Sequence, residues 1–214
     1  MHHSRKSAVT ATASRQPVAV TWEELEAKVK ACRRCTLSAT CTQKVFGKGA
    51  REARVVVVGE APRAQDDMYG EPFHDKIGLF LRKTLANTGF VKGDVFLCTL
   101  MKCRPPKNRE PYPQEILACV GYLLDQIELI HPDVVVTLGQ VALKALVPKG
   151  KARVGSVRGD FIKAHGYLLV PTWNPAYVLG SKSYLRVKEF QKDLKRVHEK
   201  VFDPAGESLL SRMT

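Results

Sequence analysis

Four cysteines of this chain have types and spacing that could hold a metal. Cys32 and Cys35 form a C-x-x-C knuckle, and Cys103 and Cys119 follow far along the chain, sixteen residues apart. Four thiolates can ligate a structural Zn²⁺ or an iron–sulfur cluster. Zinc ribbons more often use two knuckles, but the pattern alone leaves zinc, a cluster and a set of merely buried thiols open.

The two remaining cysteines have other expected roles. Cys98 lies in an apolar run and is expected to pack as a small buried side chain. Cys41 lies near the knuckle and is a candidate for a spare or substitute ligand. Six cysteines in 214 residues are too sparse for a disulfide-stapled secreted fold, and the polar, basic start is not typical of a signal peptide. We therefore expect a soluble cytoplasmic protein.

The charge balance points to a polyanionic partner. The chain carries 34 Lys and Arg against 21 Asp and Glu, a net charge of +13. Such a surplus concentrates nucleic acid at the surface, with membrane lipid and small phosphates as the anionic alternatives. No apolar run approaches the ~20 residues of a membrane span, so we expect DNA or RNA and no membrane. Hydrophobic residues at 44% and charged residues at 26% are typical of a globular domain.

The elements that must position these residues follow a βα pattern. Four short, nearly continuous apolar runs predict strands buried on both faces, and helical patterns separate them. Their spacing of ~35–40 residues predicts βα units, so the expected fold is α/β, with three α/β/α layers around a central four-stranded parallel sheet. The predicted strands are residues 54–58, 95–99, 133–137 and 167–170.

The domain is expected to span residues 21–202. Residues 1–20 contain no acidic residue and no apolar period, which predicts a disordered basic arm. Thr21 and Glu24 form a capping box, so the first helix is expected to begin there. Residues 203–214 are expected to be a loose C-terminal tail.

Unusual residues follow each predicted strand. In open parallel sheets, ligands bind outside the carboxyl ends of the strands, so these segments are expected to converge on one cleft. The segments are Gly59-Glu-Ala-Pro62, Met101-Lys-Cys-Arg-Pro-Pro106, Leu138-Gly-Gln140 and Pro171-Thr-Trp-Asn-Pro175.

Several of these segments carry a family resemblance. The sequence resembles the family 4 uracil-DNA glycosylases, the iron–sulfur branch of that superfamily, over about residues 25–200. The motifs that carry it are Cys32-x-x-Cys35, Gly59-Glu-Ala-Pro62, Asp66-Asp67, Gly70-Glu-Pro-Phe73, Lys102-Cys-Arg-Pro-Pro-Lys-Asn-Arg109, Pro113-Gln-Glu-Ile-Leu-Ala-Cys119 and Leu138-Gly-Gln-Val-Ala142.

The resemblance implies a cofactor and an activity. By it, Cys32, Cys35, Cys103 and Cys119 ligate a structural [4Fe-4S] cluster. The implied activity is that of a DNA glycosylase, which flips a base out of the helix and hydrolyses its N-glycosidic bond to leave an abasic site. We expect the protein to act as a monomer.

The resemblance also assigns roles in a base pocket. Phe73 is implied to stack on the flipped base, and Glu60 and Ala61 to line the pocket. Asp66 aligns with the family's acidic residue near the sugar, where a carboxylate can orient water and stabilise an oxocarbenium-like sugar. Asn174 stands where the family has a His that donates to the base carbonyl. Glu60, Asp66 and Asn174 are therefore the expected catalytic residues.

The chain departs from the family pattern inside this pocket. The family has Gly, Val, Gly and Asn at the positions of Arg63, His74, Asp75 and Thr99. Asn reads an imide edge with a donor and an acceptor, whereas Thr offers one hydroxyl, which costs about 1–3 kcal/mol of base discrimination by analogy with base-edge readout. The expected base-binding residues are Ala61, Arg63, Phe73, His74, Asp75 and Thr99.

The polar changes motivate a hypothesis about the target. The target base is uracil or, given the altered pocket, a modified pyrimidine, for example a hydroxymethylated or glycosylated cytosine of phage DNA. Two alternatives stay open: a catalytically silent module that binds modified or damaged bases, and a cluster protein attached to a polymerase or another partner.

The DNA grip is expected to come from basic side chains beside this pocket. Lys182, Arg186 and Lys188 form one basic segment, and Lys102, Arg104, Lys107 and Arg109 form another. Leu179 is a candidate for the apolar wedge that fills the place of the flipped base, with ordinary core packing as the alternative.

Overall fold

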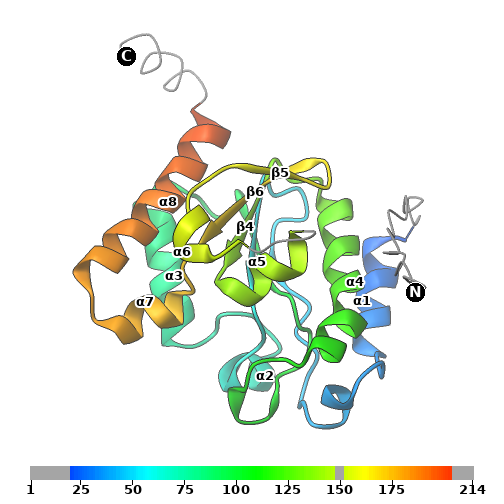
Figure 1. Cartoon of the computed structure of the whole chain (residues 1–214). Coiled ribbons are helices and arrows are strands. Elements are labelled where there is room, and N and C mark those ends of the chain that lie inside the picture. Colours follow the sequence, from blue (N-terminus) through cyan, green and yellow to red (C-terminus); the bar gives the residue numbers. More distant parts are fainter. Residues whose placement is uncertain (1–19, 148–151, 204–214) are drawn as a thin grey trace, which may run out of the picture.

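The computed structural model describes residues 20–147 and 152–203 (Figure 1). Its centre is a sheet of six strands in the order β1-β3-β2-β4-β6-β5. The four inner strands are parallel to one another, and both edge strands are antiparallel to their neighbours. The strands are β1 (Lys48–Gly49), β2 (Val55–Gly59), β3 (Val95–Thr99), β4 (Val134–Leu138), β5 (Ile162–Ala164) and β6 (Tyr167–Thr172).

The parallel core confirms the predicted fold. Every residue of β2 and β4 is buried, as runs of valine between two helical layers require. Within β2, Val55 and Val57 pack on one face, and Val56 and Val58 pack on the other. The sequence pattern missed both edge strands because they are only two and three residues long and carry no buried apolar side chain.

Helices cover both faces of the sheet (Figure 1). The core on one face receives α1, α4, α5 and α6, and the core on the other receives α3, α7 and α8. The helices are α1 (Trp22–Lys30), α2 (Ala64–Tyr69), α3 (Lys76–Asn87), α4 (Pro113–Ile130), α5 (Gln140–Leu146), α6 (Val154–Val157), α7 (Pro175–Ser181) and α8 (Tyr184–Phe202), with 3₁₀ turns at Thr36–Ala39 and Pro106–Asn108.

The ends of the domain are nearly where the pattern placed them. The capping box at Thr21 is present, with Glu24 N donating to Thr21 Oγ1 and Thr21 N donating to Glu24 Oε2. Val20, assigned to the arm, is instead buried in the core, so the packed domain reaches one residue further. The expected arm up to residue 19 and the tail from residue 204 lie outside the described residues. None of the described helices is long and apolar enough to cross a membrane.

Backbone hydrogen bonds join the loops at the carboxyl edge of the sheet. Leu100 N and Met101 N donate to Gly59 O and Glu60 O, which ties the segment after β3 to the segment after β2. Gly139 N donates to Thr172 O, which ties the segment after β4 to the end of β6. The predicted convergence of these segments is therefore built into the backbone.

Candidate active site

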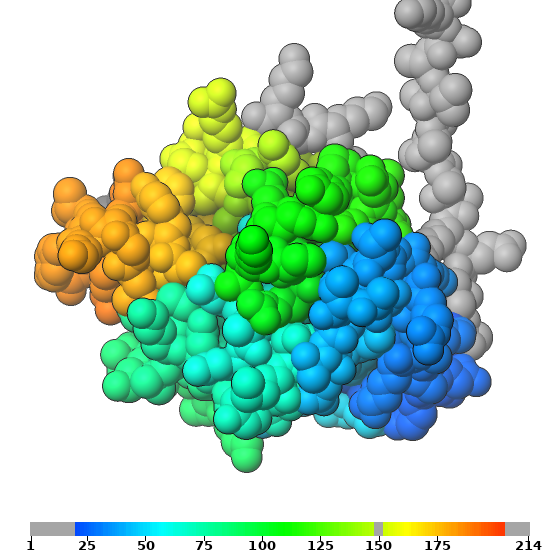
Figure 2. Space-filling model, turned by 90° about the horizontal axis from the view of Figure 1, so that it is seen from below, coloured from blue at the N-terminus to red at the C-terminus, as the bar shows by residue number. Residues whose placement is uncertain are grey.

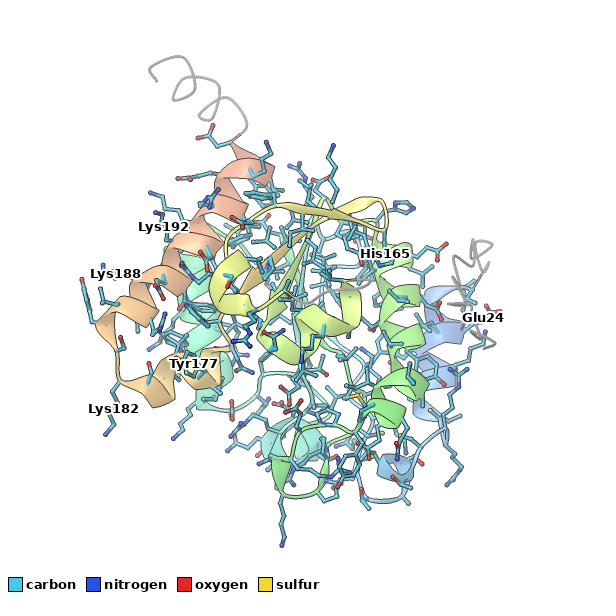
Figure 3. All side chains as sticks on the ribbon, in the orientation of Figure 1. Glu24, His165, Tyr177, Lys182, Lys188 and Lys192 are labelled. Atoms are coloured by element: carbon cyan, nitrogen blue, oxygen red, sulfur yellow. The ribbon has the colours of Figure 1, made fainter. Side chains whose placement is uncertain are left out.

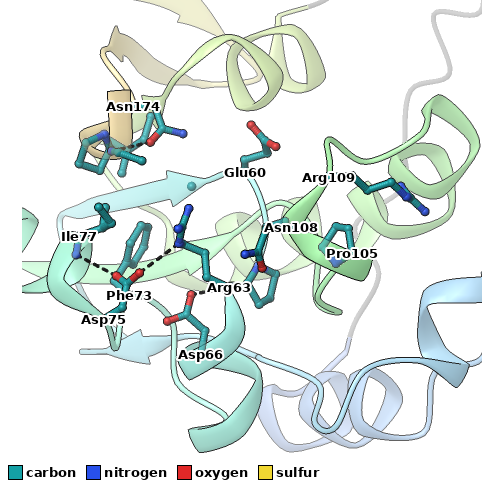
Figure 4. A pocket seen from close by; sticks show the side chains of 16 residues that line it. Glu60, Arg63, Asp66, Phe73, Asp75, Ile77, Pro105, Asn108, Arg109 and Asn174 are labelled. Atoms are coloured by element: carbon teal, nitrogen blue, oxygen red, sulfur yellow. Dashed lines mark hydrogen bonds and ion pairs between the residues drawn. The ribbon is translucent and has the colours of Figure 1, made fainter. Parts of the chain in front are cut away.

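A cavity of about 80 Å³ opens among these loops (Figure 4). The segments of the chain that form it meet on one face of the molecule (Figure 2). Its walls come from the loops after β2 and β6, the segment before α3 and the loop of residues 102–112, called the proline-rich loop below. The lining residues are Gly59, Glu60, Ala61, Pro62, Arg63, Asp66, Phe73, Asp75, Ile77, Pro105, Asn108, Arg109, Leu138, Asn174, Pro175 and Ala176.

Phe73 presents its ring to the cavity from a constrained backbone position. Its φ of 58° is in the left-handed region, and Arg82 Nη1 holds its carbonyl at 2.7 Å. The ring lies against Gly59, where a Cβ atom would come within 2.7 Å of Phe73 Cζ. A Cβ at Gly78 would lie 1.5 Å from Phe73 O. These two glycines therefore allow the aromatic wall to stand where it does.

Asp66 is held by backbone amides. Its Oδ2 accepts from Arg63 N at 2.9 Å and its Oδ1 accepts from His74 N at 2.6 Å, and the residue is only 2% exposed. Burial raises the pKa of this carboxyl, and the surrounding amides oppose part of that rise. Both oxygens thus serve to join the segment after β2 to the Phe73 loop.

Glu60 is the second acidic wall of the cavity. The structure gives its carboxylate no hydrogen-bond partner among the described residues, and Figure 4 shows the group at the cavity. Burial raises its pKa, and the negative charge of Glu110 raises it further. Glu60 is therefore the carboxylate with acceptor capacity left for a bound molecule.

Asn174 faces the cavity from the N-terminus of α7. Its Oδ1 caps the helix by accepting from Ala176 N at 2.9 Å. A Cβ at Gly139, whose φ is +93°, would lie 3.0 Å from Asn174 Cβ, so the loop after β4 packs closely against it. The cap occupies the oxygen and leaves the Nδ2 amide as the polar group that Asn174 can offer.

Arg63 and Asp75 form an ion pair at the cavity. Arg63 Nε lies 3.0 Å from Asp75 Oδ2. Asp75 Oδ1 also caps α3, accepting from Ile77 N at 2.9 Å and Gly78 N at 3.2 Å. Both residues line the cavity, and so does Ala61.

Two expected base-binding residues lie outside the cavity wall. Thr99 is buried, and its hydroxyl donates to Met101 O at 2.7 Å. His74 stacks on Tyr69 with ring centroids 4.2 Å apart, and its Nδ1 lies 3.8 Å from Glu71 Oε2. The structure therefore does not bring these two side chains together with Phe73 and Asn174 around the cavity.

The cysteines gather between α1, α4 and the proline-rich loop. Cys103 and Cys119 are buried in one core, and Cys32, Cys35 and Cys41 pack against it. As thiolates, Cys32 and Cys35 would raise the pKa of Cys119, and Cys41 and Cys119 would raise the pKa of Cys103. Cys98 is fully buried in β3, as its apolar surroundings predicted.

The thiols have the donor chemistry of a cluster site. Burial is the main cause that raises the pKa values of Cys103 and Cys119 as free thiols, and the backbone amide of Lys102 donates to Cys119 Sγ at 3.3 Å. Within the described residues, no three His, Cys, Asp or Glu side chains already form a metal-binding group. The four predicted thiols therefore fit a sulfur-ligated metal in the kind of donor atom they supply.

The prediction that Lys102 contacts DNA is wrong. Lys102 is 1% exposed, and its Nζ donates to Phe46 O at 3.3 Å, Thr99 O at 2.8 Å and Gln126 Oε1 at 2.6 Å. Three acceptors offset the cost of burying its charge, so it braces the loops and does not face solvent. Arg109 is similarly engaged, with both Nη atoms on the carboxylate of buried Glu115.

The other basic segment lies at the outer corner of α7 and α8 (Figure 3). Arg186 stacks on Trp173 at 4.6 Å and pairs with Glu189 at 2.8 Å. Lys188 Nζ lies 5.3 Å from the centre of the Tyr184 ring, Lys182 caps α7, and Leu179 is 37% exposed. Lys182, Lys188 and Leu179 are thus open to a partner, and Arg186 is tied to its neighbours.

Comparison with known proteins agrees with this geometry. The family model of the uracil DNA glycosylase superfamily matches residues 46–198. The chain belongs to this superfamily. A type-4 uracil-DNA glycosylase of Thermotoga maritima is 41% identical over 75% of this chain and 84% of the relative. One of Archaeoglobus fulgidus is 34% identical over 83% and 92%, and a type-5 uracil-DNA glycosylase of Pyrobaculum aerophilum is 29% identical over 69% and 72%. These matches support family 4 within the superfamily.

The cavity also has walls that the motifs did not single out as base-binding. Pro105, Asn108 and Arg109 line it from the proline-rich loop, and Leu138 lines it from the end of β4. The signal was present, because all four stand inside motifs shared with the family. Arg109 was instead predicted to be one of the basic side chains that contact DNA.

Proposed function

We propose that this protein is a DNA N-glycosylase that takes a flipped pyrimidine into the cavity and hydrolyses its N-glycosidic bond. Membership of the superfamily and the names of its type-4 relatives support uracil as a substrate. The observation that carries the proposal is the convergence of Glu60, Phe73 and Asn174 on one cavity at the carboxyl edge of the sheet. The base must leave the helix to reach it, because the bond is inaccessible in the stack.

The base is held and its departure assisted from two sides. The Phe73 ring offers an aromatic face for stacking. The base leaves as an anion, and Asn174 Nδ2 donates to the carbonyl oxygen that gathers this charge. Because Oδ1 is fixed on Ala176 N, the amide is oriented before the substrate arrives.

The sugar side of the reaction is assigned to Glu60. As the glycosidic bond breaks, the sugar becomes positively charged, and an ionised carboxylate stabilises it and orients the attacking water. Asp66 was the expected residue for this role, but it is only 2% exposed and both of its oxygens already accept from backbone amides. We assign Asp66 to positioning the Phe73 loop and Glu60, whose oxygens have no described partner, to the sugar and water.

The finer target is proposed to be a modified pyrimidine. The end of β3 offers no free donor–acceptor pair for the imide edge of uracil, since the Thr99 hydroxyl donates its hydrogen to Met101 O. Instead, the cavity wall carries a charged pair, Arg63 and Asp75. A hydroxymethylated or glycosylated cytosine, as in phage DNA, has polar groups that such a wall can bind.

We also propose that Cys32, Cys35, Cys103 and Cys119 hold a [4Fe-4S] cluster. When bound, the cluster supplies a covalent cross-link between the segment after α1, the proline-rich loop and α4. Lys102 N, donating to Cys119 Sγ, would stabilise the thiolate. The protein is proposed to act on DNA as a monomer.

One experiment tests the activity against the silent-module alternative, which the loss of the family's His motivates. Purified protein is incubated with matched oligonucleotides carrying uracil, hypoxanthine, cytosine, 5-hydroxymethylcytosine or glucosylated 5-hydroxymethylcytosine, and abasic sites are revealed by alkaline strand breakage. Breakage at the test base supports the glycosylase. Tight binding together with no breakage of any strand supports the silent module. Excision of uracil with no activity on a modified base would defeat the finer proposal alone.

A further inference from the structure

Two of the positions that depart from the family pattern contact each other. Arg63 replaces a glycine and Asp75 replaces another, and their side chains form an ion pair of 3.0 Å at the wall of the base cavity. Figure 4 shows the Arg63 guanidinium beside the Phe73 ring, where a flipped base would stack. A glycine at either position would leave this part of the wall open.

Asp75 is the fixed member of the pair. Its carboxylate is only 16% exposed, and its two oxygens accept from Ile77 N, Gly78 N and Arg63 Nε. Arg63 is 45% exposed, and its Nη1 and Nη2 groups have no hydrogen-bond partner among the described residues. Asp75 thus anchors a guanidinium whose outer edge, with four N–H donors, is available to a ligand.

A second hollow shares this ion pair with the base cavity. It encloses about 310 Å³ and is lined by Arg63, Ala64, Gln65, Asp75, Lys76 and Asn108. Arg63, Asp75 and Asn108 also line the base cavity, so the ion pair is part of a wall common to both spaces. The base cavity encloses about 80 Å³, so a bulky substituent on the base has to leave it, and the larger hollow lies next to it.

We propose that Arg63 and Asp75 are specificity-determining residues that direct a hydroxyl-bearing substituent of the flipped base into the second hollow. This inference rests on the proposed function and names its substrate class: pyrimidines that carry a hydroxymethyl or glycosyl group.

The charges of the pair favour a neutral substituent. Asp75 balances the positive charge of Arg63, and a balanced pair offers donors from the guanidinium and a remaining lone pair on the carboxylate. A sugar hydroxyl, which both donates and accepts, matches this pair. A phosphate would match an arginine without a carboxylate partner better. The polar side chains of Gln65 and Asn108 extend the same chemistry into the hollow, and the exposed Lys76 that also lines it adds N–H donors for a hydroxyl oxygen.

The test compares discrimination between bases. The variants are Arg63→Gly, Asp75→Asn and their combination; asparagine keeps an oxygen to cap α3 but removes the charge that anchors Arg63. The matched control is Arg54→Ala with Asp133→Ala, another ion pair, of 2.6 Å, which lies at the opposite, amino edge of the sheet. Melting temperature and visible absorbance confirm that each variant folds.

The readout is the ratio of excision rates for glucosylated 5-hydroxymethylcytosine and uracil, together with the ratio of affinities for the same strands. Removing a hydrogen bond to the substituent is expected to lower these ratios at least about 10-fold, the effect of about 1.4 kcal/mol. The control pair should leave them unchanged. Both single variants should lower these ratios, since each breaks the same ion pair.

The outcomes separate this inference from the activity on which it rests. If the wild type excises uracil and the ratios do not change in any variant, the pair has no role in specificity and the glycosylase stands. If nothing is excised but the affinity ratio falls in the variants, the pair is confirmed and the catalytic proposal fails. If Arg63→Gly weakens binding to every strand equally, Arg63 contacts a phosphate and the inference is overturned.

Discussion

Asn174 Oδ1 accepts a hydrogen bond of 2.9 Å from the backbone amide of Ala176, two residues along the chain. This bond turns an amide side chain, which could face either way, into a group with one defined donor toward the cavity. The same contact therefore both begins α7 and orients the proposed catalytic donor.

Asn174→Asp is expected to lose excision without losing stability. Aspartate retains an oxygen to cap α7 but replaces the Nδ2 donor by a second oxygen. Removing one donor to a developing anion costs about 10²–10³ in kcat. Single-turnover excision measures the loss, and thermal unfolding checks the cap. Normal kcat in this variant would remove Asn174 from the mechanism.

Asn174→His is the converse change. It restores the family's residue, so uracil excision is expected to rise relative to that of a modified pyrimidine. The measurement is the same single-turnover assay on both substrates. An unchanged preference would show that the identity of residue 174 does not contribute to base choice.

The pH dependence of excision is expected to follow Glu60. Its proposed role needs the ionised form, and burial raises its pKa above the ordinary glutamate value, with Glu110 adding to the rise. Excision should therefore fall as the pH drops, with the decline beginning at a higher pH than an ordinary glutamate would give. Glu60→Gln should lower kcat and abolish this acid limb.

Glu110→Gln provides the matched control for that profile. Glu110 is exposed, and its negative charge opposes ionisation of Glu60. Removing the charge should move the acid limb to lower pH while kcat at neutral pH stays the same. An acid limb that Glu110→Gln leaves in place would show that another group controls it.

The cluster is expected to depend on four of the six cysteines. Cys119→Ser should abolish the absorbance shoulder near 400 nm that an iron–sulfur cluster gives and that zinc does not. Cys98→Ala should keep it, because Cys98 packs inside β3. The melting temperature should fall in the first variant by more than in the second. Colourless wild-type protein containing zinc would contradict the assignment.

The parallel sheet could be predicted because each of its inner strands is a short, nearly continuous run of apolar residues. The valine runs of β2 and β4 are apolar on both faces. Such runs indicate a sheet that is covered by helices on both sides. The short helices α2, α6 and α7 were not predicted, since four to seven residues make at most two turns and give a weak periodic signal. Tertiary contacts determine them, as in α2, where Asp66 and Asp67 are buried and bonded to other loops.

The site was predictable in its motifs but not in its contacts. Spacing and resemblance identified Phe73 and Asn174, and the structure places both at the cavity. The same reasoning could not show that Lys102 turns inward to three acceptors. Nor could it show that Arg63 and Asp75, twelve residues apart, would pair. Side-chain direction in loops depends on acceptors supplied by distant segments, which a motif does not record.

Stability should decline in acid through the Arg109–Glu115 pair. The guanidinium of Arg109 lowers the pKa of Glu115, so the folded state binds the proton less readily than the unfolded state. This contribution is present above the ordinary glutamate pKa and is lost as the pH falls below it. Urea midpoints measured from neutral to acid pH should show the decline. Glu115→Gln should reduce the midpoint at neutral pH and remove this part of the pH dependence.

DNA binding should depend on salt through the corner of α7 and α8. Lys182 and Lys188 lie toward the carboxyl edge of the sheet, where the cavity is. Lys92 precedes β3 and therefore lies at the opposite, amino edge. Lys182→Glu and Lys188→Glu should each weaken binding to all sequences alike and reduce the slope of log K against log salt by about 0.9 for each phosphate that the variant no longer neutralises. Lys92→Glu changes the net charge equally, so it controls for the general field of the protein and should alter the affinity much less. Equal effects of the three variants, measured by fluorescence anisotropy across a salt series, would show that the net charge of +13 alone attracts DNA and that this corner does not bind it directly.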